Sequence, residues 1–302
     1  MFIFNQTFIF TTLALLAFAA NSVFCRLALG DNQIDAGSFT IIRLLSGSLF
    51  LGLFLAVKSY YFKPQLGSQS ENFSEAINYK KSRGSWLSAI WLFIYAITFS
   101  YAYIQLDTAT GALVLFAVVQ LAMLLIGLIN GRKLSVAEWL GLFLAVAGFI
   151  YLLAPQVTSP SLIALILMSI AGVSWAFYTL AGKKSIDPSR DTIFNFLRTL
   201  PFIAILALLN IEYTYLTNEG VINAIFSGVL ASAVGYLLWY QALTALRHNV
   251  AAVVQLLVPV LAAIAGFILL NESVSIVFLI SSAMILGGIL LVIKNPKFTL
   301  IK

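Results

Sequence analysis

Long apolar runs of about 20 residues, the length that spans a bilayer core as a helix, follow one another through almost the whole sequence. Their continuity distinguishes them from the ten-residue alternation of transmembrane β-strands. Hydrophobic residues make up 61% of the 302 residues and charged residues only 9%, whereas a soluble domain averages about 25% charged residues. The sequence therefore predicts an all-α integral membrane protein.

Counting the apolar runs predicts ten transmembrane helices. They cover residues 7–29, 36–57, 86–104, 109–129, 136–153, 161–181, 192–210, 221–243, 249–270 and 274–293. Several of the connections between them are very short, so neighbouring helices must run antiparallel.

Basic residues occupy only alternate loops between these predicted spans. Fourteen of the 17 basic residues belong to this one set, namely Lys58, Lys63, Lys80, Lys81, Arg83, Arg132, Lys133, Lys183, Lys184, Arg190, Arg247, Lys294, Lys297 and Lys302. The other set of loops carries acidic residues instead: Asp31, Asp35, Asp107, Glu212, Glu219 and Glu272. Because basic loops remain in the cytoplasm, we expect both termini to be cytoplasmic, in a cell inner (plasma) membrane. The net charge of +6 follows from this orientation and does not indicate nucleic-acid binding.

Two long stretches of the chain share one layout. Residues 108–153 and 248–293 are each apolar, break at a short polar turn and become apolar again, and they align without a gap at an offset of 140. In this alignment the charge reverses, because Arg132 falls on Glu272. A reversal of this kind is expected when one unit is inserted upside down relative to the other.

The chain is accordingly predicted to consist of two inverted five-helix repeats. The first repeat covers residues 1–153, including a cytoplasmic loop at 59–85, and the second covers residues 154–302. Five spans is an odd number, so a second copy must enter the membrane with the opposite orientation. Asp107, which falls on Arg247, shows the same exchange of charge between the two sides.

Several short motifs, taken in order, resemble the drug/metabolite transporter superfamily, in particular its ten-span EamA-type members. They are NSVF at 21–24, FTIIR at 39–43, SWAFY at 174–178, VP at 258–259, LNE at 270–272 and GG at 287–288. The resemblance covers essentially the whole chain. It implies secondary transport of small organic solutes, often efflux of amino acids or related metabolites, through a central cavity between the two repeats. Spans five and ten are implied to be more peripheral.

One position departs from the family pattern. Members often have a proline in span four like Pro259 in span nine, whereas here the matching residue is Val119, followed by Gln120. A bend is therefore expected at Pro259 and at Pro201, while span four has no proline to bend it.

Three arginines lie within predicted spans, where burying a cation in the hydrocarbon core costs free energy. Each of them therefore requires a structural or functional explanation. Arg26 is close enough to the end of span one to extend toward the interface. Arg43 and Arg198 lie about 10 Å from the nearer end of their spans. Either they attract a carboxylate or phosphate on a solute, or they lock helices together by donating to neighbouring polar groups.

Acidic residues, in contrast, are confined to span ends. A proton-coupled carrier commonly uses a buried carboxylate as its proton-binding site. The absence of an acidic residue from the middle of the predicted spans therefore favours facilitated transport or exchange. His248 is the single histidine and is expected at a solvated helix end, and Cys25 is the single cysteine, so no disulfide within the chain is possible.

Polar and aromatic side chains at helical spacing are the candidates for the cavity lining. Together with Arg43 and Arg198, the predicted substrate-binding residues are Asn21, Ser22, Tyr95, Phe99, Gln120, Ser174, Trp175, Tyr178, Trp239 and Gln255. The alternative is plain packing for the aromatic side chains and interhelical hydrogen bonding for the amides.

These features favour a secondary transporter that works by alternating access on amino acids or other small zwitterionic or anionic solutes, with export as the implied direction. The expected partners are the solute and the lipid bilayer, for a monomer or homodimer, without nucleic acid. No catalytic residues, metal site or cofactor are predicted, because the sequence has no phosphate-binding loop, metal-ligand spacing or nucleophile–base pair. The alternative is a membrane-embedded enzyme whose buried arginines bind a lipid or lipid-linked substrate.

Overall fold

The computed structural model describes residues 2–61, 83–131, 134–153, 161–182, 185, 187–243, 245–246 and 248–293. Most of the predicted loop at 59–85 lies outside these residues. So do most of the basic loop residues: Lys63, Lys80, Lys81, Arg132, Lys133, Lys183, Lys184, Arg247, Lys294, Lys297 and Lys302.

The described residues form the ten predicted spans, and the protein is an all-α membrane protein. Seven spans are α1 (Phe2–Gly30), α2 (Ala36–Tyr61), α4 (Trp86–Ala102), α5 (Thr108–Ile129), α6 (Val136–Leu153), α7 (Ser161–Gly182) and α14 (Ile276–Ile293). The other three are interrupted: α8 (Pro188–Arg198) with α9 (Leu200–Asn210), α10 (Asn218–Phe226) with η3 (Ser227–Val234) and α11 (Gly235–Leu243), and α12 (His248–Gln255) with α13 (Leu257–Leu270). Helices suit these apolar segments because each backbone polar group is satisfied within its own span.

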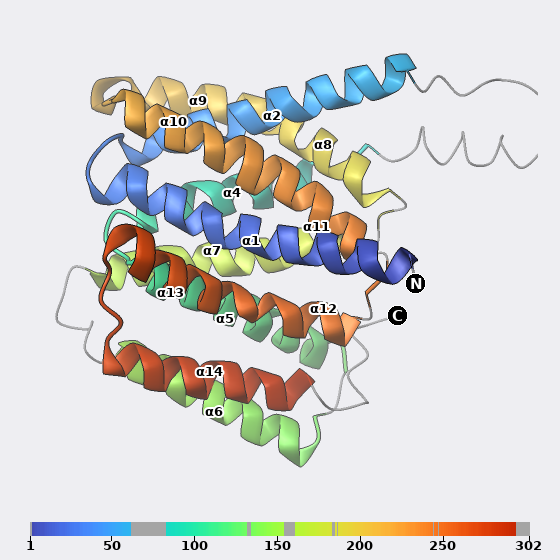
Figure 1. Ribbon diagram of the computed structural model, residues 1–302, viewed down its shortest axis with the longest axis vertical. Helices are drawn as coiled ribbons and strands as arrows, with labels where there is room; N and C mark the ends of the chain where they lie inside the picture. Colours follow the sequence, from blue (N-terminus) through green and yellow to red (C-terminus); the bar gives the residue numbers. More distant parts are fainter. Residues whose placement is uncertain are drawn as a thin grey trace, which may run out of the picture.

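The spans lie side by side in one bundle, and α1 begins on the same side on which α14 ends (Figure 1). We call this the terminal side. The opposite side carries the turns from α1 to α2, from α4 to α5 and from α13 to α14, together with the short helix η2 (Ile211–Tyr213).

Helices from the first and second halves of the chain pack together in matching pairs. In the centre, α7 packs on α4 and α5, while α1 packs on α11 and α13. The same relation therefore recurs with the two halves exchanged. At one edge, α6 and α14 form a pair that is set apart from the remaining helices (Figure 1).

Glycines allow α6 and α14 to approach closely. A methyl group added to Gly141 would lie 2.5 Å from the carbonyl oxygen of Gly288, so neither position has room for a side chain. Small residues at a membrane interface let two helices pack backbone against backbone. The peripheral pair is thus held by a close glycine contact, away from the centre of the bundle.

The three interruptions differ in cause. The break between α8 and α9 at Thr199 comes two residues before Pro201, and the break between α12 and α13 at Leu256 comes three before Pro259. Both bends were predicted, because proline cannot donate the helical hydrogen bond to the preceding turn. The helix α5, with Val119 in place of a proline, is continuous. The third interruption, the π-helical segment η3, contains no proline and was not predicted.

Candidate functional site

Arg43 lies at the centre of the bundle with 1% of its surface exposed. It is the eighth residue of α2, so it lies about 10 Å along the axis from the start of that helix. Its Nε donates to the Ser232 hydroxyl at 3.1 Å, and its Nη2 donates to the Tyr95 hydroxyl at 3.2 Å. The guanidinium carbon also lies 5.0 Å from the ring centroid of Phe99. The cation is thus held between α2, α4 and η3.

Arg43 keeps an unused donor in this position. Among the described residues, its Nη1 atom has no hydrogen-bond partner although it is fully buried. A buried N–H without an acceptor costs about 1–3 kcal/mol, and more when it carries charge. In a membrane protein, a buried cation with an unused donor is a candidate binding group.

Asn21 links α1 to these residues, and we call Arg43, Tyr95, Asn21, Ser227 and Ser232 the Arg43 cluster. Its amide nitrogen donates to the Tyr95 hydroxyl at 3.4 Å, and its amide oxygen accepts from the Ser227 hydroxyl at 2.7 Å. The Tyr95 hydroxyl therefore accepts from both Asn21 and Arg43.

The π-helical geometry of η3 explains how one segment reaches both partners. Ser227 and Ser232 are five residues apart, a spacing that places side chains on different faces of an α-helix. The wider turn of a π-helix brings residues i and i+5 close to one face, and such segments are frequent at functional sites. Ser227 therefore meets Asn21 while Ser232 meets Arg43.

Aromatic rings surround the polar cluster. Trp175 of α7 lies 4.9 Å from Tyr95 and 4.8 Å from Tyr236 of α11, and Phe18 of α1 lies 5.8 Å from Trp239. Two of these rings have unused polar atoms within the described part of the chain, the Tyr236 hydroxyl and the Trp239 Nε1. The rings line a cavity of only about 10 Å³ together with Asn21 and Tyr95 of the cluster, while Arg43 lies behind Tyr95 and Phe99 and is not a lining residue. This volume is close to the smallest that holds one water molecule.

The cavity lining combines predicted residues with others that the sequence did not single out. Asn21, Tyr95, Phe99 and Trp175 were predicted, whereas Phe18, Leu115, Phe116 and Tyr236 complete the lining. An apolar residue such as Phe18 has no sequence signal that separates it from ordinary core. Ser227 and Ser232 were also missed, because their pairing depends on the π-helical turn.

The other predicted residues are distributed around this centre. Trp239 contacts Phe18, and Tyr178 lies 5.4 Å from Trp175. Ser22 and Ser174 are both buried, with 1% of their surface exposed.

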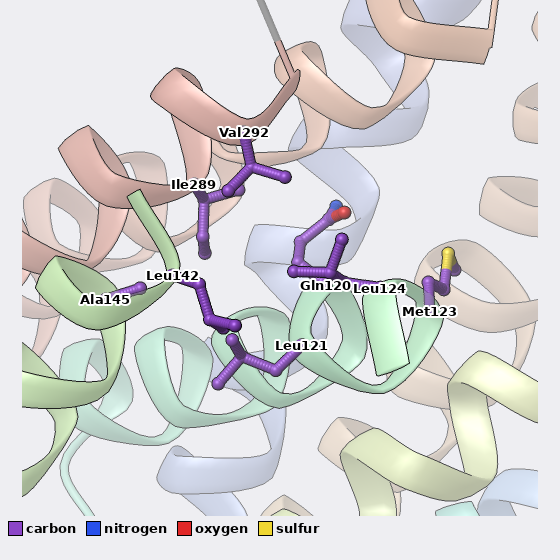
Figure 2. A pocket seen from close by; sticks show the side chains of 8 residues that line it. All are labelled: Gln120, Leu121, Met123, Leu124, Leu142, Ala145, Ile289 and Val292. Carbon is purple, nitrogen blue, oxygen red and sulfur yellow. The ribbon is translucent and has the colours of Figure 1, made fainter. Parts of the chain in front are cut away.

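Two deep amides behave differently from each other. Gln255 is buried, and its amide nitrogen has no partner within the described ranges. Gln120 lines a different pocket, between α5 and the α6–α14 pair, together with Leu142, Ala145 and Ile289 (Figure 2). The structure therefore does not bring Gln120 to the Arg43 cluster.

Arg198 also lies apart from the cluster. It is the last residue of α8, where its Nη1 donates to the backbone carbonyl of Arg83, and its guanidinium lies 5.8 Å from the Trp86 ring. The nearby turn is fixed further, because Asp191 and Asn195 accept from the backbone N–H groups of residues 84 and 85. These contacts match the helix-locking alternative for Arg198.

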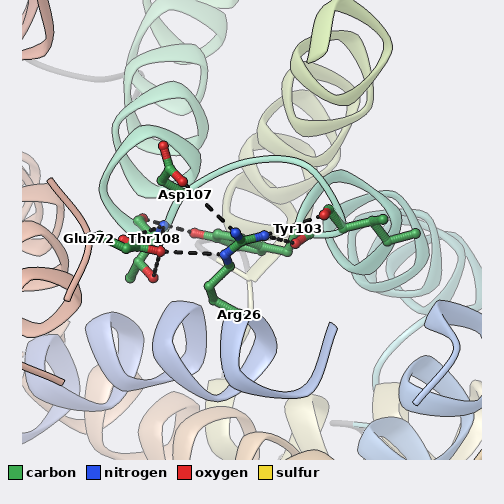
Figure 3. A network of polar contacts seen from close by, with 6 residues as sticks. Arg26, Tyr103, Asp107, Thr108 and Glu272 are labelled. Atoms are coloured by element: carbon green, nitrogen blue, oxygen red, sulfur yellow. Dashed lines mark hydrogen bonds and ion pairs between the residues drawn. The ribbon is translucent and has the colours of Figure 1, made fainter. Parts of the chain in front are cut away.

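A second polar network closes the opposite side of the bundle (Figure 3). Arg26, at the end of α1, lies 3.5 Å from the Glu272 carboxylate and 4.0 Å from Asp107, and it donates to the carbonyl of Tyr103. Glu272 also accepts from the backbone N–H of Thr108 at 3.0 Å, which caps the start of α5. We call these contacts the opposite-side latch. It joins α1 and α5 to the turn between α13 and α14.

Asp35 forms a third polar centre, in the turn between α1 and α2. Its carboxylate accepts from the N–H of Ser38 at 2.8 Å, the amide of Asn210 at 2.7 Å and the N–H of Tyr215 at 2.9 Å. Partial burial by itself raises the pKa of Asp35, but the hydrogen bonds to its charged form outweigh this and leave the pKa below its usual value. The charged form therefore fastens the start of α2 to the turn after α9.

Comparisons with known proteins assign the fold to a class. An uncharacterised protein of Pseudomonas aeruginosa is 42% identical over 289 residues, which is 96% of this chain and 95% of the relative. An uncharacterised transporter of Archaeoglobus fulgidus is 26% identical over 95% of this chain and 97% of the relative. A solved crystal structure matches with a TM-score of 0.58 and 18% identity, over 93% of this chain and 95% of that one, which supports the fold.

The ten-helix bundle and these relatives define a multi-pass membrane transporter. The model of the EamA-like transporter family matches residues 162–294, and the chain belongs to this family. The resemblance to the drug/metabolite transporter superfamily is thereby confirmed.

Proposed function

We propose that the protein is a secondary transporter that carries small organic solutes with an acidic group, zwitterionic or anionic, across the cell inner (plasma) membrane by alternating access. The solute binds at the Arg43 cluster, between two inverted five-helix repeats, and export is the direction that the family resemblance favours. The observation that supports this most directly is the buried Nη1 of Arg43, which has no acceptor among the described residues.

The closed cavity agrees with an alternating-access cycle. A volume of about 10 Å³ cannot hold an organic solute, so the helices must separate before one enters. The cluster joins α1, α2, α4, α7 and η3, which come from both halves of the chain. A relative motion of the two halves would therefore open the site toward one side at a time.

The mode of coupling follows from the same cluster. The side chains that line the cavity are aromatic, aliphatic or amide groups, and none of those described is a carboxylate that could bind and release a coupling proton. We therefore expect facilitated transport or solute exchange. Flux should continue when the pH gradient is removed.

The test is counterflow in sealed proteoliposomes loaded with a mixture of amino acids and organic acids, with mass spectrometry to identify which solute exchanges. Arg43→Gln should abolish the exchange, whereas Arg198→Gln serves as a matched control because Arg198 lies outside the cluster. Equal loss in both variants would contradict the assignment of the site. Conversion of a solute or lipid by the purified protein in detergent would instead favour the membrane-embedded enzyme.

A further inference from the structure

The charges around the Arg43 cluster do not balance. The helices that contribute to the Arg43 cluster and to the rings around it, namely α1, α2, α4, α7, η3 and α11, contain no Asp or Glu within their bounds. Of the other helices packed on α2, α9 has no acidic residue, while α8 and α10 carry Asp191 and Glu219 in their first turns. Arg26 is the cation on α1, and it is already paired with Glu272 at the opposite side. The closed site therefore carries one buried positive charge that the surrounding helices do not neutralise.

The unused nitrogen atoms in and around the cluster are donors. Arg43 Nη1 and Trp239 Nε1 can only donate. The hydroxyl oxygens of Ser232 and Tyr95 already accept from Arg43, and the Asn21 carbonyl accepts from Ser227. The charged group that is left for a solute is therefore the Nη1 edge of Arg43.

The arrangement of the bonds on Arg43 leaves a defined edge for the solute. Ser232 and Tyr95 engage Nε and Nη2, while both hydrogens of Nη1 are unengaged by the described residues. A carboxylate oxygen can accept a hydrogen bond from Nη1. The rest of the solute would lie against the rings of Phe18, Trp175 and Tyr236.

From this uncompensated positive charge and the rings around it we propose that the transported solute is a monovalent organic anion with an apolar body, such as an arylalkanoate, and not a zwitterion. The proposal rests on the proposed function and narrows its substrate class. One negative charge neutralises the site, whereas a zwitterion has no net charge and would leave the charge of Arg43 uncompensated in the buried site. A dianion would leave an excess negative charge in the membrane core.

The test compares solutes that share one skeleton and differ in charge: 3-phenylpropanoate, phenylalanine, phenylsuccinate and phenethylamine. Binding to the purified protein is measured by quenching of tryptophan fluorescence and confirmed by calorimetry. The monoanion should bind at least about tenfold more tightly than phenylalanine, a difference of about 1.4 kcal/mol, because the ammonium of phenylalanine adds a second positive charge to the buried site. Arg43→Gln should remove this preference, whereas Arg198→Gln should keep it.

Transport is measured in a separate experiment, so that the results can contradict the transporter function and the preference for a monovalent anion independently of each other. Counterflow of the bound solute in proteoliposomes tests the transporter. If phenylalanine binds as tightly as 3-phenylpropanoate and exchanges in an Arg43-dependent way, the anion proposal is wrong and the proposed function stands. If the monoanion binds but no solute exchanges, the proposed function is wrong. Failure of 3-phenylpropanoate and of aliphatic monoanions such as hexanoate to bind would also overturn the anion proposal.

Discussion

At the scale of single residues, Ser232 is the side chain that fixes the orientation of the Arg43 guanidinium. Its hydroxyl accepts from Nε at 3.1 Å and is almost fully buried. A hydrogen bond to a charged group contributes about 1.5–3 kcal/mol. We expect Ser232→Ala to raise the KM of transport about tenfold while kcat changes less, and Ser232→Thr to restore most of the affinity.

The control for Ser232 is Ser100, a buried serine that donates only to a carbonyl of its own helix. Ser100→Ala should leave KM unchanged. If Ser232→Ala also leaves KM unchanged, or if Ser232→Thr is as impaired as the alanine variant, Ser232 does not position Arg43.

Asp35 makes a prediction about pH at the same scale. Its pKa is lowered in the folded protein, so its charged form stabilises the fold. This contribution is present above the unfolded pKa of about 4, and it is lost as the pH falls through the lower folded pKa. Asp35→Asn should therefore lower the thermal unfolding temperature at neutral pH, and the difference from the wild type should shrink at acidic pH.

The measurement for Asp35 is thermal unfolding in detergent over a series of pH values. Asp31→Asn is the matched control, because Asp31 is an exposed carboxylate in the same turn. A difference between wild type and Asp35→Asn that grows toward acidic pH would mean that the charged carboxylate does not stabilise the fold.

At the scale of elements, η3 depends on a close approach to α2. A methyl group added to Gly228 would overlap both the Arg43 carbonyl oxygen and the Ser46 hydroxyl. Gly228→Ala must therefore push η3 away from α2 and lengthen the bond between Arg43 and Ser232. Overpacking of this kind costs about 1–3 kcal/mol, so we expect lower thermal stability together with weaker solute binding.

Gly52 is the control for this effect, since a methyl group there would meet only Leu197, at an ordinary 3.5 Å. Gly52→Ala should retain stability and transport. Wild-type binding by Gly228→Ala would show that the register of η3 against α2 is unimportant for the site.

The sequence was sufficient to predict the helices but only part of the candidate site. Apolar length and the two prolines, Pro201 and Pro259, were sufficient for the ten spans and two of their breaks, because bilayer thickness and proline chemistry act locally. The π-helical turn has no such local signal. Consequently Asn21 and Tyr95 were predicted at the site, whereas Ser232 was not. Gln120 is polar and deep, yet it faces the peripheral helices, because depth does not specify the direction in which a side chain points.

At the scale of the whole molecule, we expect the opposite-side latch to break before the site opens to that side. Glu272 contributes both the ion pair with Arg26 and the cap of α5. Glu272→Gln removes its charge and weakens both contacts, so we expect the open form to gain population. Cys25, the single cysteine, is fully buried next to Arg26 and provides an intrinsic probe.

The measurement is the rate at which a membrane-impermeant maleimide labels Cys25. The rate should rise several-fold in Glu272→Gln and stay unchanged in Glu219→Gln, an exposed carboxylate near the start of α10. Equal labelling of Cys25 in all three proteins would mean that the latch does not control access from this side.

The peripheral pair of α6 and α14 also has a consequence for the surrounding lipid. Both helices expose large apolar side chains, among them Phe143, Ile150 and Leu279. Because the pair lies at one edge of the bundle, acyl chains cover the faces that are turned away from the other helices. The hydrocarbon of the bilayer therefore solvates this flank in the way that neighbouring side chains solvate the centre of the bundle.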